Sequence, residues 1–533
     1  MAVIKVDALV VGAGFAGMYQ LLCLRDKLNL KVAVVERGEE VGGTWYWNRY
    51  PGARCDSESH AYQYYFSDEL AREWKWTERF PDHAEIRRYL NYVADKFKLR
   101  PDIRFKTEII GARYDDAANL WRATTSCGDE YEAKYFITAV GCLSTANVPK
   151  IDGLSAFKGK WYHTGQWPHE GVDFTGKRVG IIGTGSTGIQ AIPVIAEKAK
   201  HLTVFQRTAN YSIPARNAPL TQEFKKYVED HFEEIREITR TNTNGQAFYI
   251  ENRSVLETSP EERVKILDAL WEKGGFQFRA GFNDVLNNKE ANDKIAEFII
   301  EKIRQKIKDP KVADILTDID HPFAAKRPPI DTQYFETYNR DNVTLVDLRP
   351  APIERITERG IKTATNEYEL DVIVFATGFD AMTRPLLSLN IEGERGLPLT
   401  EAWNAGPRNY LGLQVPGFPN MFTITGPGSP SVLTNMPVAI EQHVEWITQC
   451  IADLQAEGFK KIEATEAATV DWLEHVNAAA NKTLLPMAKH SWYLGANVPG
   501  KPRVFMPYAG GMAHYRMECE EIVKDGYRGF ART

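Results

Sequence analysis

Val6-Asp7-Ala8-Leu9-Val10-Val11-Gly12-Ala13-Gly14-Phe15-Ala16-Gly17 is the stretch that decides the fold. Its apolar half is typical of a strand buried in a parallel sheet. Gly12 permits a tight turn, Gly14 lets the backbone approach a pyrophosphate, and Gly17 lets a helix pack on the strand. The helix that follows, expected over residues 18–28, directs the positive end of its dipole at the phosphates. The stretch therefore predicts a Rossmann-type dinucleotide module at the start of the chain.

An acidic residue closes the next predicted strand, which covers residues 31–35. Glu36 stands about twenty residues after the glycines, where a carboxylate accepts a hydrogen bond from a ribose 2′-hydroxyl. The same negative charge would repel a 2′-phosphate. This first module is therefore expected to hold an unphosphorylated adenosine.

A second glycine turn, Gly183-Thr184-Gly185-Ser186-Thr187-Gly188, follows a predicted strand over residues 177–182. The hydroxyls of Ser186 and Thr187 can reach phosphate oxygens. The next predicted strand, residues 201–205, ends in Gln206-Arg207-Thr208 and not in an acid. A guanidinium at that place favours a 2′-phosphate, so this module is expected to bind NADPH rather than NADH.

The two turns predict an α/β fold class with two Rossmann-like dinucleotide-binding domains and a helical insertion. Charged segments with apolar residues at helical spacing, over residues 222–240, 260–273 and 289–308, mark that insertion. Buried strands that return to the two glycine turns are expected over residues 134–141 and 371–380.

The chain is expected to cross between the two modules more than once. The predicted segments are the first part of an FAD-binding domain (1–150), the first part of an NADP-binding domain (151–215), the helical insertion (216–323), the second part of the NADP-binding domain (324–384) and the second part of the FAD-binding domain (385–533).

Length and composition exclude several classes of protein. A chain of 533 residues is too long for a single core, and a net charge of −6 argues against nucleic acid or an anionic membrane as partner. Six cysteines without a C-x-x-C pair exclude a dithiol redox centre and a clustered zinc site, and no metal ligand is assigned. Lys5 and Asp7 interrupt the apolar start, which is therefore a first strand and not a signal peptide. No apolar run is long enough to cross a bilayer, and a cytoplasmic monomer or weak homo-oligomer is expected.

Four other stretches are candidates for the site. Residues 42–56, rich in glycine and aromatic side chains, are expected to form an ordered loop beside a flavin ring rather than a helix. Residues 157–168 read F-x-G-x-x-x-H-x-x-x-W-P and lie where the chain crosses to the second module. Residues 274–281 are a candidate mobile loop near the site, and residues 326–329, two cations before two prolines, form a stiff non-helical segment.

Taken together, these motifs resemble those of the Baeyer–Villiger monooxygenases, flavoproteins that use NADPH and oxygen to convert ketones to esters or lactones. The resemblance rests on both glycine turns, on the stretch 157–168 between them, on G-G-x-W-x-x-x-x-Y-P-G-x-x-x-D within 42–56, and on Lys326-Arg327 after the insertion. It covers essentially the whole chain.

The resemblance implies roles for individual residues. The residues expected to contact FAD are Gly12, Gly14, Phe15, Gly17, Glu36, Thr44, Trp45, Asp56, Tyr62 and Met436. Those expected to contact NADP are Arg54, Gly183, Thr184, Gly185, Ser186, Thr187, Gly188, Gln190, Arg207, Thr208, Lys326, Arg327 and Trp492. The structural or gating residues are Phe157, Gly159, His163 and Trp167, of which His163 is expected to fix the pose of the two modules by hydrogen bonding. The substrate pocket is expected to include Ser431, Val432 and Leu433.

Two nucleotide sites of opposite ribose preference imply that hydride passes from NADPH to FAD, with oxygen as the final acceptor. In the family that the motifs resemble, a peroxide at C4a of the flavin attacks the ketone carbonyl as its anion. Arg327 would be the catalytic cation that holds this anion and the oxyanion of the adduct, because an arginine stays protonated in a dry site. Asp56 would orient Arg327 through a charge-assisted pair.

Two alternative functions stay open. Flavin monooxygenases that oxidise nitrogen and sulfur have a similar linker motif, but without the terminal W-P and without an equivalent of Arg327. A non-catalytic flavin redox sensor would need neither Arg327 nor Asp56. The ketone itself is not identified, although the loop over residues 429–433 is similar to that of aryl- and bulky-ketone members and indicates a roomy pocket.

Overall fold

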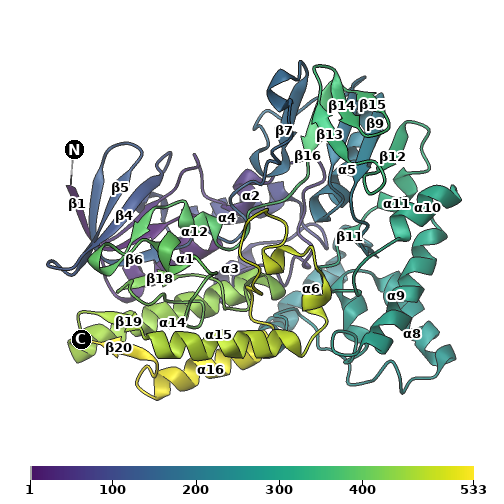
Figure 1. Ribbon diagram of the computed structural model, residues 1–533. Coiled ribbons are helices and arrows are strands. Elements are labelled where there is room, and N and C mark those ends of the chain that lie inside the picture. The colour runs from purple at the N-terminus through teal and green to yellow at the C-terminus, as the bar shows by residue number, and fades with distance from the viewer. Residues whose placement is uncertain (1–2) are drawn as a thin grey trace.

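The computed structural model describes residues 3–533, which form two lobes, each built on a sheet of its own (Figure 1). In spatial order the first sheet contains β17 (Ile391–Glu392), β4 (Ile109–Asp115), β5 (Leu120–Thr125), β6 (Glu130–Thr138), β1 (Val3–Val11), β2 (Val32–Val35) and β3 (Ile103–Arg104), and β18 (Met421–Thr423) pairs with β6. The second sheet contains β12 (Val343–Asp347), β9 (His201–Gln206), β8 (Arg178–Ile182), β16 (Val372–Phe375) and β7 (Lys160–His163). The first sheet is mixed, because β5 pairs antiparallel with β4 and β6, whereas all pairs of the second sheet are parallel. The chain is therefore α/β with two dinucleotide-type sheets, as the sequence predicts.

Three smaller sheets join or cover the lobes. Their strands are β10 (Ile213–Pro214) with β11 (Ile330–Asp331); β13 (Ile353–Ile356), β14 (Gly360–Thr363) and β15 (Glu367–Glu369); and β19 (Ile462–Ala464) with β20 (Phe530–Arg532).

The helices, in chain order, are α1 (Phe15–Leu22), α2 (Thr44–Trp47), α3 (Asp68–Glu73), α4 (His83–Lys96), α5 (Ser186–Lys198), α6 (Gln222–Asp230), α7 (Phe232–Thr241), α8 (Pro260–Lys273), α9 (Lys289–Arg304), α10 (Pro310–Thr317), α11 (Tyr334–Thr337), α12 (Arg384–Leu387), α13 (Leu399–Ala402), α14 (Met436–Glu457), α15 (Glu466–Asn481) and α16 (Met512–Lys524). No helix within residues 3–533 combines the length and the apolarity that spanning a bilayer requires.

In the first lobe, β1 is an interior strand and pairs in parallel with both β2 and β6. The observed helix differs at both ends from the helix expected over residues 18–28. It starts at Phe15, because the glycine turn itself forms its first turn, with Met18 N–H donating to the carbonyl oxygen of Gly14. Its last turn, Cys23–Lys27, is a π-helix.

In the second lobe, part of the stretch 157–168 becomes a strand. β7 pairs in parallel with β16, with Lys160 opposite Val372 and His163 opposite Phe375. The crossing segment is therefore also the edge strand of the second sheet, and this pairing fixes its position against the strand that returns to the second glycine turn.

The helical insertion packs on both lobes. The helix expected over residues 222–240 is broken at His231 into α6 and α7. Ile235 of α7 lies in the core of the first lobe, whereas Leu267 and Ile299, from α8 and α9, lie in the core of the second. The domain boundaries given above remain a prediction.

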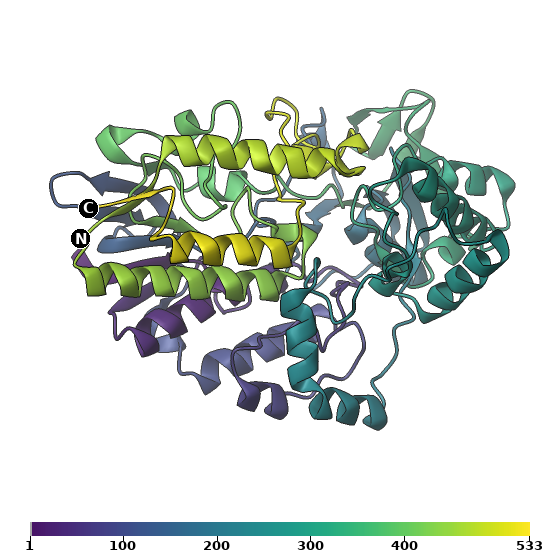
Figure 2. The same ribbon diagram turned by 90° about the horizontal axis from the view of Figure 1, so that it is seen from below.

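Three long C-terminal helices, α14, α15 and α16, lie beside one another over the first lobe (Figure 2). Glu441 on α14 is buried, and its Oε1 atom accepts hydrogen bonds from the backbone N–H groups of Tyr65 (2.6 Å) and Phe66 (3.0 Å). Burial raises the pKa of Glu441 to about 7.

Candidate active site

The first glycine turn has the tight backbone that a bound pyrophosphate requires. Gly12 adopts φ +105°, and a Cβ atom on it would lie 2.6 Å from the carbonyl oxygen of Ala139. A Cβ atom on Gly17 would lie 1.8 Å from the carbonyl oxygen of Gly12, so only glycine lets α1 approach β1 this closely. Gly14 faces the Cα atom of Gly43, and the first turn of α1 contains no acidic residue. Its N–H groups and dipole are therefore available to an anion.

Glu36 is buried at the end of β2 and points at this turn. Its Oε2 atom accepts from the N–H of Ala13 at 2.8 Å, and its Oε1 atom accepts from the N–H of Gly38 at 2.6 Å. Burial raises the pKa of the Glu36 carboxyl group, and the two N–H donors oppose that shift. The acidic group is thus held beside the phosphate turn, at the place that the sequence indicates for ribose recognition.

The aromatic stretch after β2 is ordered, but the prediction that it contains no helix is wrong. Gly43, at φ +51°, starts the short helix α2. That turn buries Trp45, whose Nε1 atom donates to the hydroxyl of Tyr62 at 3.1 Å, while Thr44 stays exposed. Phe15 lies edge-on to Tyr62, with ring centroids 5.4 Å apart. The glycine pair makes the turn possible by allowing φ values that residues with a side chain avoid.

The second glycine turn repeats the geometry of the first. Gly183 adopts φ +111°, and a Cβ atom on Gly188 would lie 2.2 Å from the carbonyl oxygen of Gly183. At Gly185, by contrast, no atom other than its chain neighbours lies within 4 Å of the place of a Cβ atom. The backbone at Gly185 is therefore open to a ligand, at the N-terminus of α5, whose first turn also lacks acidic residues.

Arg207 directly follows β9, and its charge acts on Lys326. Arg207 is exposed, and Lys326 is half-buried. Burial lowers the pKa of Lys326, Asp320 opposes this, and the charge of Arg207 lowers the pKa further, so the two cations interact electrostatically. The adjacent Thr208 accepts a hydrogen bond through its carbonyl oxygen from the hydroxyl of Thr184 at 3.1 Å. Two cations with an exposed face form a site that suits a phosphate.

Arg327 and Asp56 form a bidentate ion pair between the lobes. Nε of Arg327 donates to Oδ2 of Asp56 at 2.6 Å, and Nη2 donates to Oδ1 at 2.7 Å. Nη1 donates to the carbonyl oxygen of Val432 at 3.1 Å, and the guanidinium lies 4.7 Å from the ring centroid of Phe276. Burial lowers the pKa of Arg327, but the carboxylate of Asp56 outweighs this and keeps the pKa above its ordinary value. The guanidinium is therefore permanently charged, and Asp56, Val432 and Phe276 hold it in place.

Apolar side chains pack next to this pair. Val432, Leu433, Met436 and Trp492 belong to one cluster, which the sequence segments 142–143, 381–382 and 492–494 bring together. Ser431 adopts φ +41° and is fully buried. Four of the residues expected at the substrate pocket or the cofactors thus line one apolar wall beside Arg327.

Comparisons with known proteins agree with this geometry. A profile of the pyridine nucleotide-disulphide oxidoreductase family matches residues 9–294. A Baeyer–Villiger monooxygenase of Pseudooceanicola batsensis is 42% identical to this chain over 99% of it and 96% of the relative. The chain belongs to the Baeyer–Villiger monooxygenases.

Two other proteins are also similar to this chain. A solved structure of an oxidised steroid monooxygenase bound to NADP is 50% identical, with a TM-score of 0.94 and coverage of 99% of both chains. A phenazine N-monooxygenase of Lysobacter antibioticus is 41% identical over 98% of this chain and 96% of its own.

As a Baeyer–Villiger monooxygenase, the chain is an NADPH-dependent FAD enzyme that converts ketones to esters or lactones with oxygen. The open backbone at Gly185 and the acid-free start of the helix after Gly14 fit two dinucleotides. The acid beside the first turn fits FAD, and the cations beside the second turn fit NADPH.

Two residues expected at NADP make contacts within the protein. The side chain of Gln190, on α5, accepts from the hydroxyl of Tyr50 at 2.7 Å and donates to the carbonyl oxygen of Arg54 at 3.1 Å. Nη1 of Arg54 donates to Glu78 (3.0 Å) and to the carbonyl oxygen of Phe80 (2.7 Å). In this monooxygenase Gln190 therefore joins the two lobes, and its contact with NADP remains a prediction.

The linker residues of the Baeyer–Villiger stretch are all packed. A Cβ atom on Gly159 would lie 2.5 Å from the ring of Phe157, and Trp167 is buried in the core of the second lobe. His163 is 1% exposed, and its Nδ1 atom accepts from the N–H of Gly165 at 3.0 Å. Burial lowers the pKa of His163 to about 4, so the ring is neutral near pH 7. The hydrogen bond of Nδ1 is local to the linker, so the role of His163 in fixing the pose of the two modules remains a prediction.

Three residues near Arg327 had no individual assignment from the sequence. They are Phe276, Arg279 and Tyr493. Tyr493 is buried, and burial raises the pKa of its hydroxyl while the charges of Arg327 and Arg279 oppose that shift. For Phe276 and Arg279, the only signal in the sequence is the Phe- and Gly-rich stretch 274–281. Most of this stretch forms a 3-10 helix over Phe276–Gly281.

Proposed function

We propose that Arg327 is the catalytic cation of ketone oxygenation in this chain and that Asp56 is its positioning partner. The observation that carries the proposal is the pair of hydrogen bonds from Arg327 to Asp56, at 2.6 and 2.7 Å, with a third to the carbonyl oxygen of Val432. The overall reaction takes a ketone, O₂, NADPH and a proton to an ester or lactone, NADP⁺ and water. The bound flavin, reduced by NADPH, supplies the activation of oxygen.

The role of Arg327 follows from its unused donors. A guanidinium carries five N–H groups, and three of them are used by Asp56 and Val432, which leaves one on Nη1 and one on Nη2. Both can donate to negative charge that develops on the reacting oxygens. Because the group is held in place beforehand, this stabilisation requires little reorganisation during the reaction.

We assign the two nucleotides by charge. The carboxylate of Glu36 suits the ribose of FAD, while the neighbouring cations Arg207 and Lys326 suit the 2′-phosphate of NADPH. Thr184 and Thr208 are already hydrogen-bonded to each other and fix the loop on which Arg207 stands.

We propose a bulky ketone, of the aryl or fused-ring kind, as the substrate. The wall formed by Val432, Leu433, Met436 and Trp492 is apolar and offers surface to a large hydrocarbon. The relative with 50% identity is named a steroid monooxygenase, which supports the same size class.

The test is turnover of a ketone panel, from small rings to aryl ketones and steroids, with NADPH under ¹⁸O₂. We expect the preferred substrate to come from the larger ketones and its ester or lactone to carry one labelled atom, read by mass. Release of hydrogen peroxide alone across the panel would contradict ketone oxygenation. Preference for the smallest rings would contradict only the size of the substrate.

Oxidation of nitrogen is the second candidate, because one relative at 41% identity is named a phenazine N-monooxygenase. A heteroaromatic amine and a phenazine belong in the same panel. An N-oxide formed in place of every ester would favour this second function.

We further propose a cytoplasmic chain that is a monomer or a weak homo-oligomer. All six cysteines are free thiols, which is typical of a reducing compartment. Sedimentation of the holoenzyme at several concentrations would measure its oligomeric state.

A further inference from the structure

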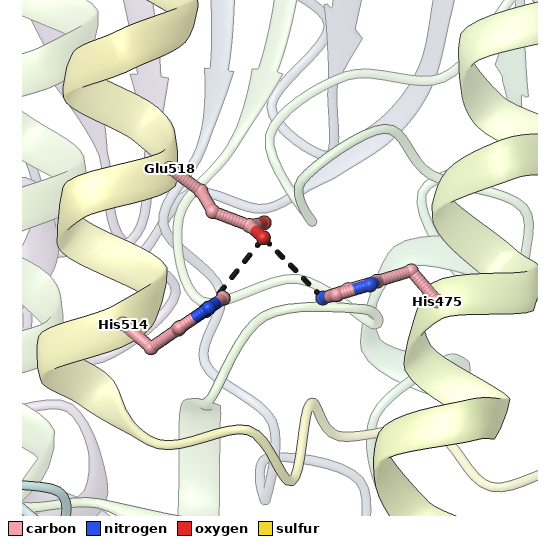
Figure 3. Close-up of side chains that lie close together, drawn as sticks. All are labelled: His475, His514 and Glu518. Carbon is pink, nitrogen blue, oxygen red and sulfur yellow. Dashed lines mark ion pairs between the residues drawn. The ribbon is translucent and has the colours of Figure 1, made fainter.

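A cluster of metal-ligating side chains lies on the C-terminal helices. His475 comes from α15, and His514 and Glu518 come from consecutive turns of α16. Glu518 lies between the two imidazoles (Figure 3). None of these residues contributes to the Arg327 site.

The donor atoms are spaced as the corners of one coordination site. Nε2 of His475 lies 3.5 Å from Oε1 of Glu518, and Nδ1 of His514 lies 3.6 Å from the same oxygen. The hydroxyl oxygen of Tyr508 lies 3.0 Å from each of these two nitrogens. Around a tetrahedral zinc ion with bonds of about 2.0–2.1 Å, neighbouring ligand atoms are about 3.3 Å apart. Two of the four separations, 3.0 Å each, are slightly shorter than this spacing, and two, 3.5 and 3.6 Å, are slightly longer.

Packing holds the ligands in this arrangement. The ring of His475 is stacked on Trp472 (centroids 5.2 Å apart) and on Tyr508 (5.4 Å). The residues His514 and Glu518 are four apart on one helix face, so their side chains point the same way. Their side chains are 50% and 26% exposed, and that of His475 is 41% exposed, so an ion can enter from solvent.

We propose that His475, His514 and Glu518 bind a divalent transition-metal cation of the zinc type, with the hydroxyl of Tyr508 at the fourth corner. Two imidazoles and one carboxylate suit zinc and do not suit magnesium or calcium, which prefer oxygen ligands throughout. Without a metal, the hydroxyl of Tyr508 is hydrogen-bonded to the imidazoles of His475 and His514.

Metal binding would tie together three segments. It would join α15 to α16 and fix Tyr508, whose backbone N–H donates to the carbonyl oxygen of Ser429 at 2.7 Å. The segment from Ser429 leads directly into the wall at Val432. The site is therefore expected to stabilise the part of the first lobe that supports the apolar wall, and it does not depend on the proposed function.

The test is titration of ZnCl₂ into tag-free, FAD-loaded enzyme after treatment with a chelator, followed by calorimetry and by thermal unfolding. We expect one zinc ion per chain and a higher midpoint of unfolding in zinc. The substitutions His514→Ala and Glu518→Gln should each weaken binding by about tenfold or more, because each removes a ligand or its charge. His231→Ala, an exposed histidine on the junction of α6 and α7, is the matched control and should bind zinc as the parent does.

Two results would overturn the proposal. One is the absence of saturable zinc binding by the parent at micromolar concentrations. The other is binding that is the same in the parent, His514→Ala and Glu518→Gln, since zinc would then occupy some other group. Loss of binding in Glu518→Gln with an unchanged midpoint of unfolding in the absence of zinc would show that the variant is folded and that the carboxylate is a ligand.

Discussion

Replacing Arg327 by Ala removes the two N–H groups that are free to stabilise negative charge. A charge-assisted hydrogen bond contributes about 1.5–2 kcal/mol net, so the two together contribute about 3–4 kcal/mol. At about 1.4 kcal/mol for each factor of ten, the rate of ester formation should fall by a factor on the order of 100 to 1000. Reduction of FAD by NADPH should be nearly unchanged, because the substitution leaves both glycine turns intact.

Rapid-mixing measurements separate these two steps. Bleaching of the flavin absorbance under anaerobic conditions gives the reduction rate, and mass spectrometry of the product after oxygen is added gives the ester. Arg408→Ala is the matched control, because this arginine forms an exposed ion pair with Glu466 away from the site. Asp56→Ala should reproduce part of the loss, since Arg327 would keep its charge but lose two of its three hydrogen bonds.

One result would refute the reasoning outright: an Arg327→Ala enzyme that makes ester at the parent rate. A second result would weaken it. If the variant also loses FAD, then removal of the cation has left Asp56 without a partner and has disturbed the fold. The double variant that also carries Asp56→Ala removes that unpaired charge, and it should hold FAD while remaining unable to make ester.

Three further predictions concern the nucleotides and the fold. Arg207→Ala should raise KM for NADPH about tenfold or more and hardly change KM for NADH in steady-state oxidation, because only NADPH carries a 2′-phosphate; an equal loss with both would show that Arg207 does not read it. Gly185→Ala should raise KM for NADPH without changing Tm, whereas Gly188→Ala should lower Tm, since its Cβ atom would lie 2.2 Å from the carbonyl oxygen of Gly183; equal Tm values would contradict this difference. Burial raises the pKa of Glu441 from 4.5 to about 7, so its contribution to stability is present in acid and is lost as pH rises through that value. As pH rises from about 5 to about 8, the Tm of Glu441→Gln should therefore rise relative to the Tm of the parent. A Tm difference that does not change with pH would show that the pKa of Glu441 is not raised.

The nucleotide turns could be predicted because their requirements are local. At Gly12, Gly17, Gly183 and Gly188, a Cβ atom would meet a carbonyl oxygen at 2.6 Å or less, so the glycines in the sequence report the backbone geometry directly. The acid after β2 is equally local, since it needs only the end of a strand and a count of residues.

Other features could not be predicted, because they depend on neighbours that are far away in the sequence. The short helix α2 was missed, since its turn depends on Gly43 packing against Gly14. The break at His231 between α6 and α7 has no proline or glycine to signal it. Likewise, nothing in the sequence near Gln190 indicates that its amide joins α5 to the loop at Tyr50.

The sequence by itself determined two dinucleotide modules, because strand, glycine turn and helix lie within a short stretch of chain. The tertiary structure alone decided which side chains meet. Asp56 and Arg327 are 271 residues apart, and they form a pair with two hydrogen bonds only because the two lobes close against each other. His475 meets His514 and Glu518 only because α15 packs beside α16. Contacts of this kind are set by the packing of whole elements, and no local pattern of residues reports them.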